Sequence, residues 1–113
     1  MAENDVVYLK HIQDAIEKIE TYTRNVEFDK FSKESLIQDG VIRRFEIIGE
    51  ATKKLSGKLR EKYSVVPWRD IAGMRDNLIH EYMGVDFVEV WNTVKKDIPF
   101  LKEKVLEIIE KEF

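Results

Sequence analysis

The fold of this protein is decided by residues 87–112, which read FVEVWNTVKKDIPFLKEKVLEIIEKE and form its longest regular pattern. Large side chains recur there at steps of three and four residues, which places them along one face of a helix. They are Phe87, Trp91, Val94, Ile98, Leu101, Val105, Ile108 and Glu112. Asp86 and Glu89 form a capping pattern before this face. Pro99 interrupts it, and because proline removes a backbone donor and clashes inside a helix, we expect a kink or a fresh start at residues 97–99.

Two more amphipathic patterns lie in the first half of the chain. One is predicted to run from a capping residue, Asp5, to about Arg24, and the other to begin at a capping residue, Ser32. The apolar positions are Leu9, Ile12, Ile16 and Ile19 in the first pattern, and Ile37, Val41, Phe45, Ile48, Ala51 or Thr52, and Leu55 in the second. Gly40 and Gly49 interrupt the second helix. Each costs about 1 kcal/mol relative to alanine, so we expect another helix to approach closely at these positions.

The connections between these patterns are short. Residues 25–31 lack periodicity and are predicted to be a connection, with Phe28 and Phe31 packed on the core. A short amphipathic piece ends at Tyr63. Residues 66–68 start a third helix, because proline is favoured at a first helical position and the residue before it is extended. That helix is predicted to continue through residue 82, with one face formed by Trp68, Ile71, Arg75, Leu78 and Tyr82.

These patterns predict an all-α fold, an antiparallel four-helix bundle with one or two short additional helices, because four apolar faces share one core. At 113 residues, the chain is expected to form one domain, residues 1–113. There is no strand alternation, internal repeat or low-complexity tract. The sequence also lacks any apolar run approaching the roughly 20 residues that span a bilayer, and its acidic start is unlike a signal peptide. We therefore expect a cytoplasmic protein.

Composition limits the possible chemistry. The chain has no cysteine, which excludes disulfides and thiolate metal sites. It has only two histidines, and His11 lies off the apolar face of the first helix, so it is predicted to be a surface residue rather than a ligand. We therefore expect neither a structural zinc site nor any other cofactor.

The net charge of −3 argues against a protein that coats nucleic acid nonspecifically. Basic residues do gather at Arg43-Arg44, 53–62, Arg69, Arg75 and Lys95-Lys96. Taken singly, each group is more often a solvated helix face than a binding site. Glu46 and Glu50 share one helix face at positions i and i+4, and such a pair is likewise more often a surface feature than a catalytic or metal-binding one.

The chemistry concentrates in residues 74–85, which read MRDNLIHEYMGV. Arg75, His80 and Tyr82 supply a permanent planar cation, an acid or base that titrates near neutral pH, and a nucleophilic phenol, a set suited to phosphate chemistry. On a straight helix, however, His80 would point about 140° away from Arg75 and lie about 7.5 Å further along. Both groups could reach one phosphate through a distorted helix end before Gly84, through the reach of the arginine, or through a second copy of the chain across a two-fold axis.

Each motif side chain also has a purely structural interpretation. The arginine could pair with Glu81 or Asp86. The histidine could be half buried and bonded to Asp76, four residues before it. The tyrosine could be a core aromatic with a satisfied hydroxyl.

Together with its flanks, the motif resembles the HEPN superfamily, and within it the HepT-like ribonuclease toxins. The flanks are Pro67-Trp68-Arg69, the run IGEA at residues 48–51, Gly84-Val85-Asp86 and Trp91, so the resemblance covers about residues 5–105. The resemblance implies a metal-independent endoribonuclease toxin of a type II toxin–antitoxin pair, with RNA as substrate and an active cleft composed from two protomers of a homodimer.

The site residues follow from this resemblance and from their chemistry. His80 is the expected base and Arg75 the expected cation on the phosphate oxygens, with Asp76 in a position to orient the histidine. The resemblance implies that Tyr82 accepts AMP from a cognate minimal nucleotidyltransferase antitoxin, which would silence the site. The alternative is a catalytically inert helical subunit that binds and regulates a nucleotidyltransferase.

Overall fold

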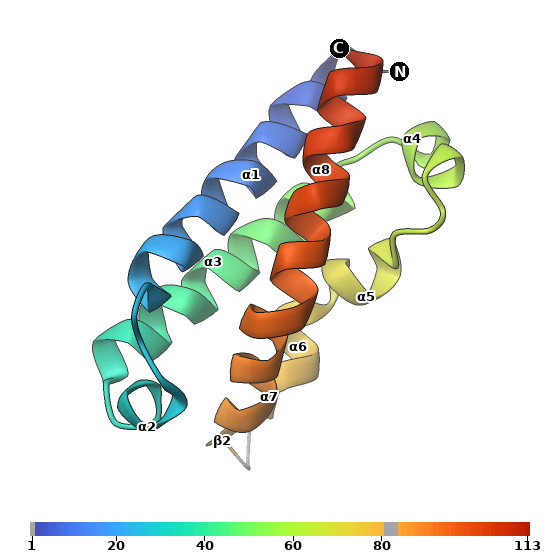
Figure 1. The fold of residues 1–113 in the computed structure, drawn as a ribbon. Coiled ribbons are helices and arrows are strands. Elements are labelled where there is room, and N and C mark those ends of the chain that lie inside the picture. Colours follow the sequence, from blue (N-terminus) through green and yellow to red (C-terminus); the bar gives the residue numbers. More distant parts are fainter. Residues whose placement is uncertain (1, 81–83) are drawn as a thin grey trace.

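Three long helical segments form the body of the protein in a computed structural model, which describes residues 2–80 and 84–113 (Figure 1). They are α1 (Glu3–Thr23), α3 (Ser35–Lys53) and a C-terminal run of α7 (Phe87–Asn92), a π-helical turn η1 (Thr93–Asp97) and α8 (Ile98–Glu112). In Figure 1, α1 runs opposite to both α3 and α8, and the two chain ends lie together at one end of the molecule. The predicted all-α class is confirmed.

Short elements complete the fold. They are α2 (Phe28–Phe31), α4 (Gly57–Lys62), α5 (Trp68–Ala72), α6 (Met74–Leu78), and the strands β1 (Ile79–His80) and β2 (Gly84–Val85). The fourth main helix of the predicted bundle is the pair α5 and α6, which are separated by Gly73. The two strands pair antiparallel and were not predicted, because two residues are too few to show an alternating pattern.

The predicted apolar faces pack against one another to form the core. The fully or almost fully buried residues of the three long helices include Leu9, Ile12, Ile16, Ile19, Val41, Phe45, Ile48, Leu101, Val105 and Ile108. Burial of each such side chain stabilises the fold by roughly 1.5–3 kcal/mol relative to exposure. The faces are therefore confirmed, except that Ile37, Phe87, Trp91 and Glu112 are only partly buried.

Two predicted helix starts are wrong. Asp5 does not cap α1, which begins two residues earlier. The residue is 1% exposed, and its carboxylate accepts hydrogen bonds from the backbone N and the Oγ of Ser56, at 2.8 and 2.7 Å. Ser32 does not cap α3 either, because the preceding residues form α2 and the Ser32 hydroxyl donates to the carbonyl of Asp29. In both cases the polar side chain binds another group, so it does not cap the predicted helix: Asp5 binds Ser56, and Ser32 binds the carbonyl of Asp29.

Both glycines of α3 mark close approaches, as predicted. A Cβ at Gly40 would lie 3.1 Å from the ring of Tyr22 in α1. A Cβ at Gly49 would lie 2.9 Å from the carbonyl oxygen of Ala72, at the end of α5. Real Cβ atoms do not approach a backbone oxygen so closely, so the second glycine sets how near α3 lies to the segment that carries the motif.

The irregularity expected near Pro99 is the π-helical turn η1, which directly precedes α8. Pro99 cannot donate to the carbonyl of Lys95, and a wider turn relieves the clash that its ring would make there. The predicted cap at the start of this segment is confirmed, because Asp86 Oδ1 accepts a hydrogen bond from the backbone N of Glu89 at 3.1 Å.

Among the described residues, no helix has both the length and the apolar character that crossing a bilayer requires.

Candidate functional site

The motif begins on the short helix α6. Met74 and Leu78 face the core, with 6% and 8% of their surface exposed, whereas Arg75, Asp76 and Asn77 are exposed. The predicted apolar face placed Arg75 beside Trp68 and Ile71, and this placement is wrong. The helix breaks at Gly73, and Met74 rather than Arg75 contributes to the core.

Arg75 is held by two carboxylates. Its Nε lies 3.5 Å from Glu46 Oε2 on α3, and its Nη1 lies 3.4 Å from the neighbouring Asp76 Oδ1. The predicted ion-pair partners differ from these two, since Asp86 caps α7 and Glu81 lies outside the described residues. Glu46 therefore belongs to the candidate site, whereas its spacing from Glu50 predicted a surface glutamate. Gly49, about one turn after Glu46, could have indicated this contact from the sequence, because it marks the place where α5 approaches α3.

A small cavity of about 100 Å³ lies beside Arg75, between α3 and α6. Its charged lining residues are Arg43, Glu46, Glu50, Lys53, Arg75 and Asp76. Lys53 pairs with Glu50 at 3.2 Å, so the carboxylates of the cavity are balanced by cations. The cavity lining thus carries three cationic and three anionic side chains, and Arg75 is the cation of the motif among them.

The chain leaves the helical conformation after Leu78, so the prediction of one helix through residue 82 is wrong. His80 lies in β1, with its backbone paired to Gly84, and the backbone N of Asp86 donates to the carbonyl of Leu78 at 3.1 Å. Gly84 has φ +78°, a conformation that favours glycine. A residue with a side chain would be strained at this position.

Because His80 lies in β1, it does not share a helix with Arg75 and Asp76. The predicted angle of about 140° from Arg75 and the predicted i, i+4 contact with Asp76 both assumed a helix, so neither describes this structure. The structure brings Arg75 and Asp76 together and places the backbone of His80 two residues after α6. Tyr82, the predicted AMP acceptor, lies outside the described residues.

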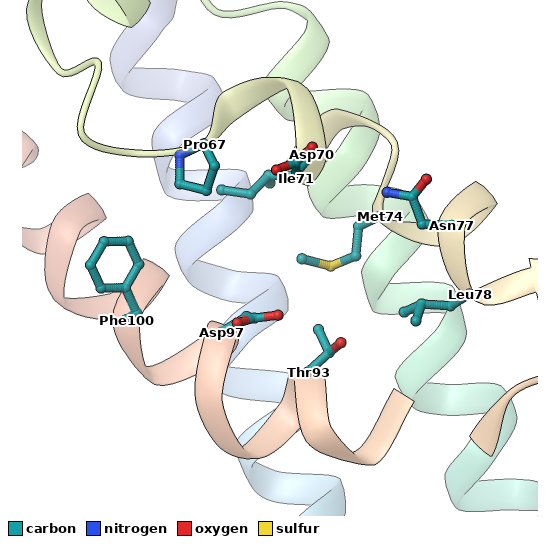
Figure 2. A pocket seen from close by; sticks show the side chains of 9 residues that line it. All are labelled: Pro67, Asp70, Ile71, Met74, Asn77, Leu78, Thr93, Asp97 and Phe100. Atoms are coloured by element: carbon teal, nitrogen blue, oxygen red, sulfur yellow. The ribbon is translucent and has the colours of Figure 1, made fainter. Parts of the chain in front are cut away.

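A larger cavity, of about 310 Å³, lies between the α5–α6 pair and the η1–α8 segment (Figure 2). It is lined by Pro67, Asp70, Ile71, Met74, Asn77, Leu78, Thr93, Asp97 and Phe100. The lining contains two carboxylates and no cationic side chain. Among the described residues, no group of three or more histidine, aspartate or glutamate side chains is placed so that it could hold a metal ion.

The chain is similar over most of its length to proteins whose names include a ribonuclease. A family model described as Ribonuclease HepT-like matches residues 12–108. A Methanocaldococcus jannaschii protein named "Gamma-glutamylcyclotransferase and putative RNase" is 51% identical over 97% of this chain, which spans only 50% of that relative.

Two further relatives match along nearly their whole length. A "Putative RNase" of Caldanaerobacter subterraneus is 46% identical over 93% of this chain and 94% of its own. A "Probable ribonuclease HepT" of Thermococcus cleftensis is 48% identical over 86% of this chain and 88% of its own. No solved structure matches the chain.

Proposed function

The chain belongs to the Ribonuclease HepT-like family, and from this premise we propose that it is an endoribonuclease that cleaves RNA without a metal ion. The observation that carries the proposal is the position of Arg75. Its side chain is 45% exposed, at the edge of a cavity lined by charged residues of both signs, on the helix that leads directly into His80. A cation presented in this way is suited to bind a phosphate group.

The proposed reaction uses the ribose 2′-hydroxyl as the nucleophile. His80 accepts the hydroxyl proton, the 2′-oxygen attacks phosphorus, and the bond from phosphorus to the 5′-oxygen breaks. The products are a 2′,3′-cyclic phosphate and a 5′-oxygen that becomes a hydroxyl by taking a proton from water, while the protonated His80 returns its proton to solvent. General base catalysis of this kind contributes a factor of about 10² to 10⁴. Arg75 stabilises the charge that develops on the phosphate oxygens, and Asp76 is proposed to orient His80.

The contacts of Arg75 support this role. Charge-assisted hydrogen bonds are typically about 2.7–2.9 Å long, and both carboxylate contacts of Arg75 are longer, at 3.5 and 3.4 Å. Both partners are also solvent-accessible, with 37% of the Glu46 side chain and 75% of the Asp76 side chain exposed. Such contacts orient the guanidinium and still leave it free to exchange a partner for a substrate phosphate.

The test is cleavage of a labelled RNA by Arg75→Ala and His80→Ala, in buffer with and without a chelator. We expect each variant to lose at least about 100-fold in rate, with an unchanged helical circular dichroism spectrum and no effect of the chelator on the wild type. The control is Arg24→Ala, which removes an exposed arginine at the end of α1, away from the motif, and should cleave normally. Inhibition of the wild type by the chelator would show that the metal-free mechanism is wrong.

We also propose that the protein is the toxin of a type II toxin–antitoxin pair. It is silenced when a cognate nucleotidyltransferase antitoxin transfers AMP from ATP to the Tyr82 hydroxyl, which loses its proton as pyrophosphate is released. This proposal is supported by the resemblance of the motif and its flanking residues to the HepT-like ribonuclease toxins. Tyr82→Phe removes one hydroxyl and keeps the ring, so it should cleave RNA and accept no label from ATP radiolabelled at the α-phosphate in the presence of the antitoxin. The control, Tyr22→Phe, should be labelled like the wild type, and labelling of the Tyr82→Phe variant would contradict the acceptor assignment.

The alternative function, a catalytically inert subunit that regulates a nucleotidyltransferase, is favoured by the net charge of −3. It would replace the ribonuclease proposal if the wild type cleaved no RNA and still bound the nucleotidyltransferase tightly. In either role we propose a homodimer, as the resemblance implies, and a cytoplasmic location, since a chain without cysteine suits a reducing compartment.

A further inference from the structure

The larger cavity has a polarity unlike that of the Arg75 site. Its apolar floor is formed by Ile71, Met74 and Leu78, each at most 8% exposed. In Figure 2, the carboxylates of Asp70 and Asp97 lie on opposite walls, from α5 and from the end of η1, and the Met74 side chain extends between them. The cavity thus combines an apolar interior with acidic groups on two sides.

The charge of the lining excludes an anionic ligand. The side chains of Asp70 and Asp97 form no hydrogen bond or ion pair within the part of the chain that the structure describes, and both residues are exposed. A phosphate at this site would face two carboxylates with no cation among the nine lining residues. A positively charged group would instead gain a charge-assisted hydrogen bond at either wall.

The remaining lining residues indicate which uncharged groups the ligand can carry. Phe100, which is 39% exposed, presents an aromatic wall, and Asn77 adds an exposed amide. Lys104 lies over the Phe100 ring at 5.6 Å, but it does not line the cavity and its charge is paired with Glu107 at 3.6 Å. The volume of about 310 Å³ is at the small end of the range for ligand sites, about 300–1,000 Å³.

We propose that this cavity binds an organic cation on an apolar stem, an amine or guanidinium whose charge lies between Asp70 and Asp97 and whose stem covers Met74 and Leu78. The proposal does not depend on RNA cleavage, because the site is on the opposite side of the α5–α6 pair from the Arg75 cavity. Two sources share this chemistry: a free aliphatic amine, and a basic side chain of a partner protein.

The experiment is a titration of the protein labelled with ¹³C at the methionine methyl groups, followed by NMR, with Met74→Leu used to assign the Met74 signal. Hexylamine and agmatine represent the free amine, and the capped dipeptide acetyl-Leu-Arg-amide represents the basic side chain of a partner protein. Hexan-1-ol has the same carbon chain as hexylamine without the charge and serves as the neutral control. We expect the Met74 methyl signal to shift saturably with the amines, with a dissociation constant of about 1 mM or lower, and far less with the alcohol.

Matched variants test the two carboxylates. Asp70→Asn and Asp97→Asn keep the side-chain shape and remove the charge, so each should weaken hexylamine binding about tenfold. Asp39→Asn removes an exposed carboxylate of α3 and should leave binding unchanged. Tighter binding of the dipeptide than of the free amines would assign the site to a protein partner, and the reverse order to a small ligand.

Three results would overturn the proposal. They are a Met74 signal that does not shift with any cation, equal affinity for hexylamine and hexan-1-ol, and unchanged hexylamine binding by the double variant Asp70→Asn/Asp97→Asn. Loss of RNA cleavage in the function test would leave all of these measurements interpretable, because none of them uses RNA.

Discussion

Arg75 is exposed on a five-residue helix, and its orientation depends on the residues that contact it. Glu46 reaches it from α3, a helix that can lie so near only because Gly49 has no side chain. A guanidinium that is held through Nε by Glu46 and through Nη1 by Asp76 presents its remaining N–H groups to a phosphate in a defined direction. At the residue scale, Glu46 is therefore a positioning residue for the proposed reaction.

We predict that Glu46→Gln lowers kcat about tenfold and changes KM little, because a mispositioned cation weakens transition-state stabilisation more than binding. Stability should change by less than about 1 kcal/mol, since the ion pair is exposed. The matched control is Glu20→Gln, which breaks the Glu20–Lys102 pair on the other side of the molecule at similar exposure, and it should leave both constants unchanged. Steady-state cleavage of a short RNA measures them, and a wild-type kcat in Glu46→Gln would show that Glu46 does not position Arg75.

At the scale of elements, the short helix α4 is fastened to the end of α8 by one carboxylate. The Tyr63 hydroxyl donates to Glu112 Oε1 at 2.6 Å, and Lys62 Nζ lies 2.6 Å from the same oxygen. The hydrogen bond to Glu112 is the main cause that raises the pKa of Tyr63 from 10.0 to about 12. The hydrogen bond from Lys62, and then that from Tyr63, lowers the pKa of Glu112.

This arrangement predicts an alkaline loss of stability. Because the folded-state pKa of Tyr63 is raised, the contribution of the hydroxyl is fully present below pH 10 and is lost as the pH rises from 10 to about 12. Tyr63→Phe should therefore lower the melting temperature by about 3 °C at pH 8 and by much less near pH 12. Lys62 remains in both proteins, so the difference between wild type and variant isolates the tyrosine.

The measurement is thermal unfolding by circular dichroism from pH 8 to pH 12, with Tyr8→Phe as the control. A difference between wild type and Tyr63→Phe that stayed constant over this range would mean that the bond to Glu112 does not contribute to stability.

At the scale of the whole molecule, the open question is whether one chain contains a complete site. The angle between Arg75 and His80 on one helix does not support a dimer, because His80 lies outside the helix. A dimer is still supported by the resemblance to HepT-like proteins and by the two-fold symmetry that is usual among small oligomers. A homodimer with a cleft composed from two protomers thus stays a prediction.

Mixing two inactive variants tests it directly. When Arg75→Ala and His80→Ala chains are refolded together in equal amounts, half of the dimers are mixed, and each mixed dimer regains one composite site with both side chains. We therefore expect about one quarter of the wild-type cleavage rate from the mixture and none from either variant alone. Sedimentation at micromolar concentration gives the oligomeric state, and an inactive mixture of confirmed dimers would mean that each protomer carries its own site.

The sequence by itself determined the helical class, the apolar faces of the long helices, the cap at Asp86 and the close approaches at Gly40 and Gly49. These features could be predicted because each depends on local spacing or on one residue type: helical periodicity, a side chain that satisfies nearby backbone donors, or a missing Cβ. The motif of Arg75, His80 and Tyr82 was visible for the same reason, as a spacing in the chain.

Tertiary structure decided where those residues lie. The buried bond of Asp5 to Ser56, the pairing of Glu46 with Arg75 and the cavity between Asp70 and Asp97 each join segments that are distant in sequence. The end of the motif helix at Leu78 depends on the chain reversal that brings Gly84 back to His80. Local periodicity carries no information on such contacts, because their stability comes from the packing of one segment against another once the helices have come together.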